Sequence, residues 1–594
     1  MNPPLTARLL VGFAAVLASG GLAVVACSDG DATPATKTDA SVADVGTSDV
    51  QTATDTGTAC PESPPKSCTA KGCTTQLGEP AVCVKNACVK LKSTECPTVA
   101  GPYDDDNAIV VAAFQDVYGT RKTTGVGRMN SHELAVTEIN GRGGIRRKDR
   151  CAAARPVVMI GCNDSNFNPD GTAWVAPASD GGTALNPQQR AIDHIAGELD
   201  VQVLVGATTS GSALALNNYL QPKYKRLFIT SSATSPDLEK PATFNASPDG
   251  TRLFWRTTAN AKGQTSAMKT VLPQLADKVR QKYSTQTVKV AVLAKNDSFG
   301  QGTADALESG LQINGAPAGG ANVNANYIRL NYREIPGKGA ANQVEQSDAL
   351  ASLVAFVPDI IITIGTEEIV AGTATVPGDA RNTGFLKPYE DAVRASGARK
   401  PFYIHSQANL TATFQAYVDL VSNFGDLAGR KDYLERTRGT NISEPTALAR
   451  SFFSRFSSSY QTPTSLLFGM AEAYDAVYVS AYLHAATDTE AAPTALQLAR
   501  AFPALVEGAT SVDVGPGTFT SANQLLISGQ KVNYNGAAGP LDWDYTNGEA
   551  PFDVNVWCVQ INGQTGKSFF QQSAGQVWRY GTGNLEGAYN CPQD

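Results

Sequence analysis

The sequence predicts an α/β protein with more than one hydrophobic core. A chain of 594 residues exceeds what a single core usually supports. From residue 107 onward, short β-branched runs alternate with helical patterns, which is typical of βαβ units around a largely parallel sheet. The composition, 42% hydrophobic and 17% charged, is that of a globular protein, and the net charge of -7 offers no attraction to nucleic acid. We therefore expect no nucleic-acid partner.

The first 26 residues have the features of an export signal. Arg8 precedes an uncharged stretch from Leu9 to Ala26 that ends in small residues before Cys27. Val24-Val25-Ala26-Cys27 is similar to a bacterial lipobox, in which the cysteine becomes a lipidated N-terminus. We expect a lipoprotein signal peptide over 1–26 and a lipid anchor at Cys27. The alternative is an uncleaved membrane span, because the apolar stretch approaches the length that crosses a bilayer. Either reading places the remaining chain outside the cytoplasm, at the cell envelope.

Residues 27–59 are rich in Asp, Thr, Ser and Ala and contain no aromatic residue. Such a segment cannot bury enough apolar surface to fold, so we expect a disordered tether. Eleven cysteines less the lipidated one leave ten, an even number that suits disulfides in an oxidising compartment.

Six of these cysteines cluster in a module at 60–98, where we expect three bridges, and each of two later pairs should form one more bridge. Zinc is the alternative for the module, but the segment has neither a C-x2-C knuckle nor a histidine, so we expect no metal and no cofactor. The module cysteines are Cys60, Cys68, Cys73, Cys83, Cys88 and Cys96, and the later pairs are Cys151 with Cys162 and Cys558 with Cys591.

Five short apolar runs predict the strands of doubly wound sheets. The helix between the first two runs has an apolar face at Leu134, Ala135 and Ile139, and a glycine-rich stretch at 141–144 ends it. Because βαβ connections are right-handed, helices should cover both faces of each sheet. The predicted strands cover 109–113, 157–160, 201–205, 288–293 and 360–364.

A series of short motifs then follows in a characteristic order. They lie at 125–145 (the glycine-flanked helix), 205–212, 229–238, 254–257, 296–302, 358–360 and 473–477. In their order and spacing over 107–545, they resemble the type I periplasmic binding proteins of the leucine/isoleucine/valine class.

The resemblance implies two Rossmann-like lobes joined by a three-segment hinge. Lobe one would comprise 107–253 plus 436–515, and lobe two 254–435 plus 516–594. Pro- and Gly-rich additions near 165–187, 371–400 and 425–447 are expected to be surface loops, one of which could cap the cleft.

The candidate ligand contacts of lobe one are Ser210 and the loop Ser232-Ala233-Thr234. Ser210 follows the strand that ends at Val205 and begins a helix, so its hydroxyl and nearby N–H groups would face a docked anion. The resemblance assigns the carboxylate-binding serine to Ser210 and the second contact loop to 232–234. The alternative is that these hydroxyls only cap helices or close turns.

In lobe two the resemblance implies contacts at Phe299 and Thr366, although Phe299 has the alternative of being lobe core. Family members that bind amino acids place a carboxylate in this lobe, but the matching segment 403–407 has none. Glu367 or Glu368 would substitute, or the ligand would lack an α-amino group. His405 is a ligand donor or a structural loop residue. The further candidate contacts are Thr209, Thr124, Glu367, His405, Ser406 and Phe468.

The predicted function is capture of a small polar ligand, such as a branched-chain amino acid or a related amide or carboxylate, for an ABC importer. Two alternatives remain: a sensory domain that presents to a receptor, and a surface interaction protein without transport. The sequence has no G-x-S-x-G elbow, no H-E-x-x-H and no P-loop, so we expect no enzyme. The partners expected are the ligand and an ABC permease or receptor, with membrane contact only through the lipid anchor, and the protein should be a monomer.

Overall fold

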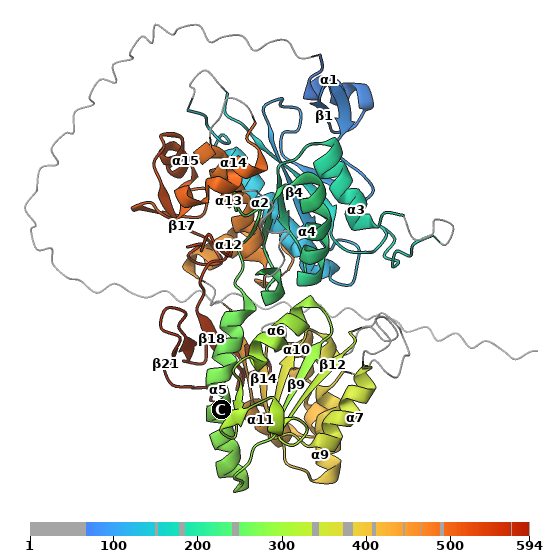
Figure 1. Ribbon diagram of the computed structural model, residues 1–594, viewed down its shortest axis with the longest axis vertical. Coiled ribbons are helices and arrows are strands. Elements are labelled where there is room, and N and C mark those ends of the chain that lie inside the picture. Colours follow the sequence, from blue (N-terminus) through green and yellow to red (C-terminus); the bar gives the residue numbers. More distant parts are fainter. Residues whose placement is uncertain are drawn as a thin grey trace, which may run out of the picture. The chain divides into compact units, whose positions relative to one another are not determined.

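Two doubly wound sheets organise the chain in the computed structural model (Figure 1). The described residues belong to one compact unit. They are 67–148, 153–177, 184–239, 249–334, 344–371, 384–406, 412–442, 446–463, 465–487, 492–571 and 573–592.

The first sheet has six strands in the order β3-β5-β4-β6-β7-β8. All neighbours are parallel except β3, which pairs antiparallel with β5 at the edge. The direction in which successive strands are added to the sheet reverses at β4. The loops after β4, β6 and β7 therefore lie together at the carboxyl ends of the strands, where ligands bind in such folds. The strands are β3 Thr98–Ala100, β4 Ile109–Gln115, β5 Val157–Asn163, β6 Val203–Gly206, β7 Leu227–Thr230 and β8 Phe254–Arg256.

Alternating side chains of β4 enter two different cores, one on each face of this sheet. Val111 and Ala113 pack with helices α2 and α13, whereas Ala112 and Phe114 pack with α3 and α4. Figure 1 shows these helices flanking the strands. The helices of this lobe are α2 Lys122–Gly141, α3 Pro187–Ile192, α4 Ser210–Tyr224, α12 Ala447–Tyr460, α13 Met470–Thr487, α14 Ala495–Arg500 and α15 Phe519–Ile527.

The second sheet has nine strands and follows the order β12-β9-β13-β14-β15-β18-β20-β21, with β19 paired to β18. The strands from β12 to β15 in this order are parallel to one another, and β18 pairs antiparallel with β15. The strands are β9 Val290–Lys295, β12 Tyr327–Tyr332, β13 Ile360–Ile364, β14 Phe402–His405, β15 Thr437–Asn441, β18 Val554–Ile561, β19 Ser568–Gln571, β20 Val577–Trp578 and β21 Leu585–Glu586.

Strand β9 likewise divides its side chains between two cores. Val290 and Val292 pack with α5 and α6, and Ala291 and Leu293 pack with α7, α9, α10 and α11. The predicted arrangement of helices on both faces of each sheet is therefore confirmed. These helices are α5 Ala261–Tyr283, α6 Ser298–Glu308, α7 Gln346–Phe356, α8 Glu368–Ala371, α9 Leu386–Ser396, α10 Ala412–Asp419 and α11 Leu427–Arg436.

The chain passes between the two lobes after β8, between β15 and α12, and before β18, and all three points differ from the expected boundaries. Residues 254–256 form β8 and pair with β7 of lobe one, so lobe two does not begin at 254. Residues 437–441 form β15 and pair with β14 of lobe two, so they do not open the second segment of lobe one. Residues 519–552 pack into the core of lobe one through α15 and through β17 (Val532–Asn535), which pairs parallel with β16 (Thr510–Asp513). The stretch 425–447, which was expected to be a loop, instead contains α11 and β15.

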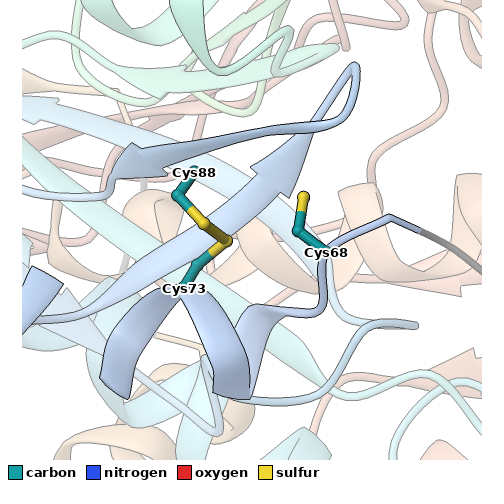
Figure 2. A group of neighbouring side chains, drawn as sticks. All are labelled: Cys68, Cys73 and Cys88. Atoms are coloured by element: carbon teal, nitrogen blue, oxygen red, sulfur yellow. A yellow bond between two sulfur atoms is a disulfide. The ribbon is translucent and has the colours of Figure 1, made fainter. Parts of the chain in front are cut away.

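The described part of the cysteine module consists of helix α1 (Ala70–Leu77) and the hairpin of β1 (Ala81–Val84) and β2 (Ala87–Lys90). Two disulfides, Cys68–Cys83 and Cys73–Cys88, join the helix side to the hairpin. Figure 2 shows the Cys73–Cys88 bond with the Cys68 sulfur nearby. These three sulfurs lie within 4.8 Å of one another, but a metal binds thiolates, and here each sulfur is in a disulfide.

The third bridge expected within the module does not form there, because Cys96 pairs with Cys162. The expected Cys151–Cys162 bridge is therefore wrong. Strand β3 joins the sheet edge with Thr98 opposite Gly161, and this pairing brings Cys96 beside Cys162. The Cys558–Cys591 bridge is confirmed. Cys60 and Cys151 lie outside the described residues.

The expectations for the N-terminal segment cannot be compared with the fold. The signal peptide over 1–26, the lipidation site Cys27 and the tether over 27–59 all lie outside the described residues. Within the described ranges, no helix is long and apolar enough to span a bilayer.

Candidate functional site

The buried guanidinium of Arg128 lies among the strand-end loops of lobe one. Arg128 is on α2, and only 4% of it is exposed. Its Nη1 donates to the carbonyl of Thr208 at 2.8 Å and to the Ser232 hydroxyl at 3.0 Å. Its Nε and Nη2 donate to the carbonyl of Phe468 at 3.0 and 2.9 Å. One cation thus connects the loops after β6 and β7 with the segment that precedes α13.

All of these acceptors are neutral. Among the described residues, no carboxylate lies within ion-pair distance of Arg128, and burial lowers the pKa of the guanidinium to about 10. A buried cation without a counter-charge is costly. Two carboxyls, those of Glu472 and Asp164, interact electrostatically with Arg128 from beyond ion-pair distance. Burial raises the pKa of each of these carboxyls to about 7.

Ser210 and Thr209 stand at the N-terminus of α4, where sequence analysis left binding and capping open. Thr209 is the N-cap, and its hydroxyl accepts from the Ser212 N–H at 3.1 Å. The Ser210 hydroxyl accepts from the N–H of Ser235, also at 3.1 Å. Capping therefore describes Thr209, whereas Ser210 holds the loop after β7 against the helix terminus.

The loop 232–234 lies beside this helix terminus and is buried. The Ser232 hydroxyl donates to the carbonyl of Ala207 and accepts from Arg128. The carbonyl of Ala233 accepts from Arg256 Nη1 at 3.2 Å, and the carbonyl of Thr234 accepts from the N–H of Ala261 at 2.8 Å. Both carbonyls are thus engaged by the chain segment that crosses to lobe two.

The Phe468 ring lies near the same cation, with its centroid 5.8 Å from the Arg128 Cζ. Gly469, the next residue, has a φ of +86°, and a Cβ there would lie 2.3 Å from Arg128 Nε. The backbone at this position thus leaves room only for glycine beside the guanidinium. Thr124 is half-buried on the same helix, α2.

A second arginine of lobe one, Arg121, reaches lobe two. Its Nη1 donates to Glu367, and its Nη2 donates to Glu334 and, at 2.7 Å, to the Thr366 hydroxyl. The carboxylate of Glu368 lies 4.0 Å from the same Nη2. Thr366 and Glu367, which were both predicted to contact the ligand, therefore lie side by side. The group that contacts them here is Arg121 of the same chain.

Lys295 supports this arrangement from the end of β9. Its ammonium lies 2.8 Å from Glu334 and 3.2 Å from Asp297. Burial alone would raise the pKa of Glu334, but Lys295 and Arg121 lower it to about 2. Burial likewise opposes the charge of Arg121, yet Glu334 and Glu367 raise its pKa above the ordinary value. Glu334 and Arg121 are therefore both ionised at neutral pH.

Phe299 lies at the start of α6 and packs partly buried against the core of lobe two, as its alternative interpretation expected. Its neighbour Ser298 makes a contact between the lobes, because the Ser235 hydroxyl donates to the Ser298 carbonyl at 2.6 Å. The N-terminus of α6 therefore lies against the loop after β7.

His405 and Ser406 lie inside lobe two. His405 is the last residue of β14 and not a loop residue; its Nδ1 is 2.7 Å from the Thr363 hydroxyl, and its ring stacks between those of Tyr403 and Trp557. Burial lowers the pKa of His405 to about 3, so it does not titrate near neutral pH. The fully buried Ser406 donates its N–H to the Thr363 carbonyl at 3.0 Å. We do not propose His405 as a ligand contact.

Sequence reasoning missed the charged groups that dominate the site. Arg128 lies within the motif at 125–145, and Arg121 is the N-cap residue of the same helix, but neither residue type signals a site alone. Lys295 is the last residue of β9 and Glu334 follows β12, and acidic or basic residues at the ends of parallel strands were the available signal.

No protein-family model matches the chain, and no curated protein matches it. Solved structures do. The leucine-binding protein LivK of Thermotoga maritima is 14% identical, with a TM-score of 0.47, over 78% of this chain and 98% of that one. The branched-chain amino acid binding protein LivJ of Streptococcus pneumoniae, in complex with isoleucine, is 13% identical, with a TM-score of 0.46, over 82% and 100%. A solute-binding protein of Rhodopseudomonas palustris, in complex with 4-hydroxybenzoate, is 14% identical, with a TM-score of 0.49, over 80% and 97%. This chain is thus similar to solute-binding proteins of ABC transporters, and at these identities and scores neither a ligand nor a role follows from the likeness.

Proposed function

We propose that the protein is an exported, lipid-anchored solute-binding protein that closes on a small polar ligand bearing an anionic group and delivers it to an ABC importer. The observation that carries the proposal is Arg128, a buried guanidinium of lobe one that is bonded only to neutral acceptors, in the loops after β6 and β7 and in the segment before α13. An anionic group at the Ser232 loop would supply the missing counter-charge.

The surrounding backbone favours the same ligand chemistry. Helix α4 spans 15 residues, and its N-terminus lies beside the Ser232 loop, so the positive end of its dipole adds to the field of Arg128. In lobe two, Glu334 and Glu367 are engaged by Arg121. Lobe one therefore offers positive charge at the Ser232 loop, whereas the acidic groups of lobe two already have a partner.

The disulfides support export. Four bridges join cysteines of the described residues, and bridges of this kind persist in oxidising compartments. We include the lipid anchor at Cys27 because of the lipobox-like motif. We include delivery to an importer because of the two-lobed fold.

Native mass spectrometry of the purified protein and a thermal-shift screen test the proposal. The screen uses matched pairs of a carboxylate and its amide, for example 4-methylpentanoate with 4-methylpentanamide and benzoate with benzamide. We expect stabilisation by one or more carboxylates and not by their amides, about 2.7 kcal/mol at a hundredfold excess over Kd. Ser232→Ala should weaken that binding, and Ser458→Ala, on the exposed surface of α12, should not. A protein that carries no small molecule and responds to no carboxylate would refute the proposal.

A further inference from the structure

The lobe-two acidic cluster, which we define as Glu334, Glu367, Glu368 and the Thr366 hydroxyl, contacts a cation that comes from lobe one. Together with Asp297, the three glutamates carry four negative charges against the one positive charge of Lys295, a formal net of −3 (−4 + 1), and Arg121 reduces it to −2.

The side chain of Arg121 is well matched to this cluster. Its guanidinium uses one terminal nitrogen for Glu367 and the other for Glu334 and Thr366, which is the divergent donor geometry that an ammonium cannot provide. Only 18% of the Arg121 side chain is exposed, and the side chains of Glu334 and Glu367 are 22% and 34% exposed. The ion pairs are therefore shielded from bulk water, so salt screens them less than surface pairs.

The lobe-one end of this contact is held in place by its own backbone. The N–H of Arg121 donates to Asp116 Oδ2 at 2.9 Å, and Asp116 Oδ1 accepts the N–H groups of Tyr118 and Gly119. The turn from 116 to 121 is thus tied to the end of β4. A connection between Arg121 and the acidic cluster therefore transmits force between the two sheets.

We propose that Arg121 is a tethered cation that binds the lobe-two acidic cluster, holds the lobes together without solute, and occupies the place that a ligand's ammonium group would take. The role that this inference gives to Arg121 rests on the proposed function, because a solute-binding protein captures its ligand by lobe closure. It also narrows the solute class: a ligand with an ammonium group must displace Arg121, whereas an anion without one need not.

The Arg121→Ala variant tests the inference without any solute. The distance between spin labels at the exposed positions Gln524 on α15 and Ser352 on α7 reports lobe separation. We expect a longer distance in Arg121→Ala, because the acidic cluster loses the cation that connects it to lobe one. In the same variant, free methylguanidinium should bind the vacated cluster with a Kd on the order of 1–10 mM in calorimetry, and sodium chloride at equal ionic strength should not abolish this binding. Methylguanidinium has no bond to lobe one, so it should leave the longer distance unchanged.

Matched variants complete the experiment. Arg500→Ala removes an exposed arginine that pairs with Asp249, and it should change neither the distance nor the binding of methylguanidinium relative to the wild type. Adding Glu334→Gln and Glu367→Gln to Arg121→Ala should abolish the binding of methylguanidinium. If Arg121→Ala does not fold, the two glutamine substitutions with Arg121 retained serve instead, and they should lengthen the distance.

Three results would overturn the inference: a wild-type distance in Arg121→Ala, no binding of methylguanidinium to that variant, or binding that survives loss of the two glutamates. In the fallback variant, a wild-type distance would do the same. Because no solute is present, these results are separate from the solute screen. A negative screen with a longer distance in Arg121→Ala rejects the proposed function alone, and a positive screen with a wild-type distance in Arg121→Ala rejects only the role of Arg121.

Discussion

The buried carboxyl of Asp475 should make the protein less stable as the pH rises from weakly acidic to weakly basic. Asp475 is on α13 and is fully buried. It accepts the N–H groups of Ala537 and Ala538, each at 2.8 Å, and the Tyr534 hydroxyl at 3.2 Å. Burial nevertheless dominates and raises the pKa of Asp475 to about 7, with a further contribution from Glu472.

The sign follows from proton binding. Between its ordinary pKa of 3.8 and the folded value of about 7, Asp475 is protonated in the folded state and ionised in the unfolded state. Raising the pH through this window therefore favours unfolding. At about 1.4 kcal/mol per unit of pKa, this single group lowers the free energy of unfolding by about 2–3 kcal/mol between about pH 5 and about pH 8. Above the folded pKa its contribution no longer changes.

Urea unfolding at these two pH values measures the effect. Asp475→Asn has no charge to bury, so its loss of stability with pH should be smaller than that of the wild type by about 2–3 kcal/mol. The side-chain amide of this variant turns its N–H groups toward one of the two backbone N–H donors. This mismatch should lower the free energy of unfolding at low pH by about 1–3 kcal/mol. Asp277→Asn, on the exposed face of α5, is the control. An equal pH dependence in wild type and Asp475→Asn would refute the reasoning.

Two further predictions follow from the disulfide that joins Cys96 to Cys162 and from the glycine beside Arg128. Replacing both cysteines by alanine should lower the free energy of unfolding by about 4 kcal/mol, because the bridge closes a loop of 66 residues, and dithiothreitol should have a smaller effect on this variant. Equal urea midpoints for variant and wild type would contradict this. Gly469→Ala should displace the guanidinium and reduce the affinity for the bound carboxylate by roughly tenfold or more, about 1.4 kcal/mol. Calorimetry that gives an unchanged Kd would remove Arg128 from the site.

The strands with apolar runs could be predicted from the sequence, because β-branched periodicity reflects burial on both faces of a parallel sheet. The run at 360–364 coincides with β13, and the helix expected to stop at the glycine-rich stretch ends at Gly141. Strand β15 could not be predicted in this way. Its sequence, Thr437 to Asn441, is polar or small throughout, although all five residues are buried. Its partners in the sheet, and not hydrophobicity, place it.

The candidate site was predictable in its loops and not in its charges. Ser232 and Thr366 were assigned through the resemblance of the motifs around them, which is a local property of the sequence. The two arginines that contact these residues are 104 and 245 positions away along the chain. Only the tertiary fold brings such groups together, so their pairing was not available from local patterns. Cys96 and Cys162 are likewise brought together only by the fold. Strand β3 pairs antiparallel with β5, so Cys96 bonds to Cys162 and not to a cysteine nearer in the sequence.

The two arginines also explain why the cleft should favour anions over amino acids. Arg121 is the N-cap residue of α2, and Arg128 lies seven positions further along, in the second turn of the helix. The N-terminal part of α2 therefore places one cation at the loops of its own lobe and the other at the acidic cluster of the other lobe. An anion satisfies the first cation without disturbing the second. An amino acid would gain the same contact through its carboxylate, but its ammonium could reach the glutamates only by displacing Arg121, at the cost of an ion pair that is partly buried. The affinity difference between 4-methylpentanoate and leucine should therefore narrow in Arg121→Ala, and a difference equal to that of the wild type would show that the tethered cation does not set specificity.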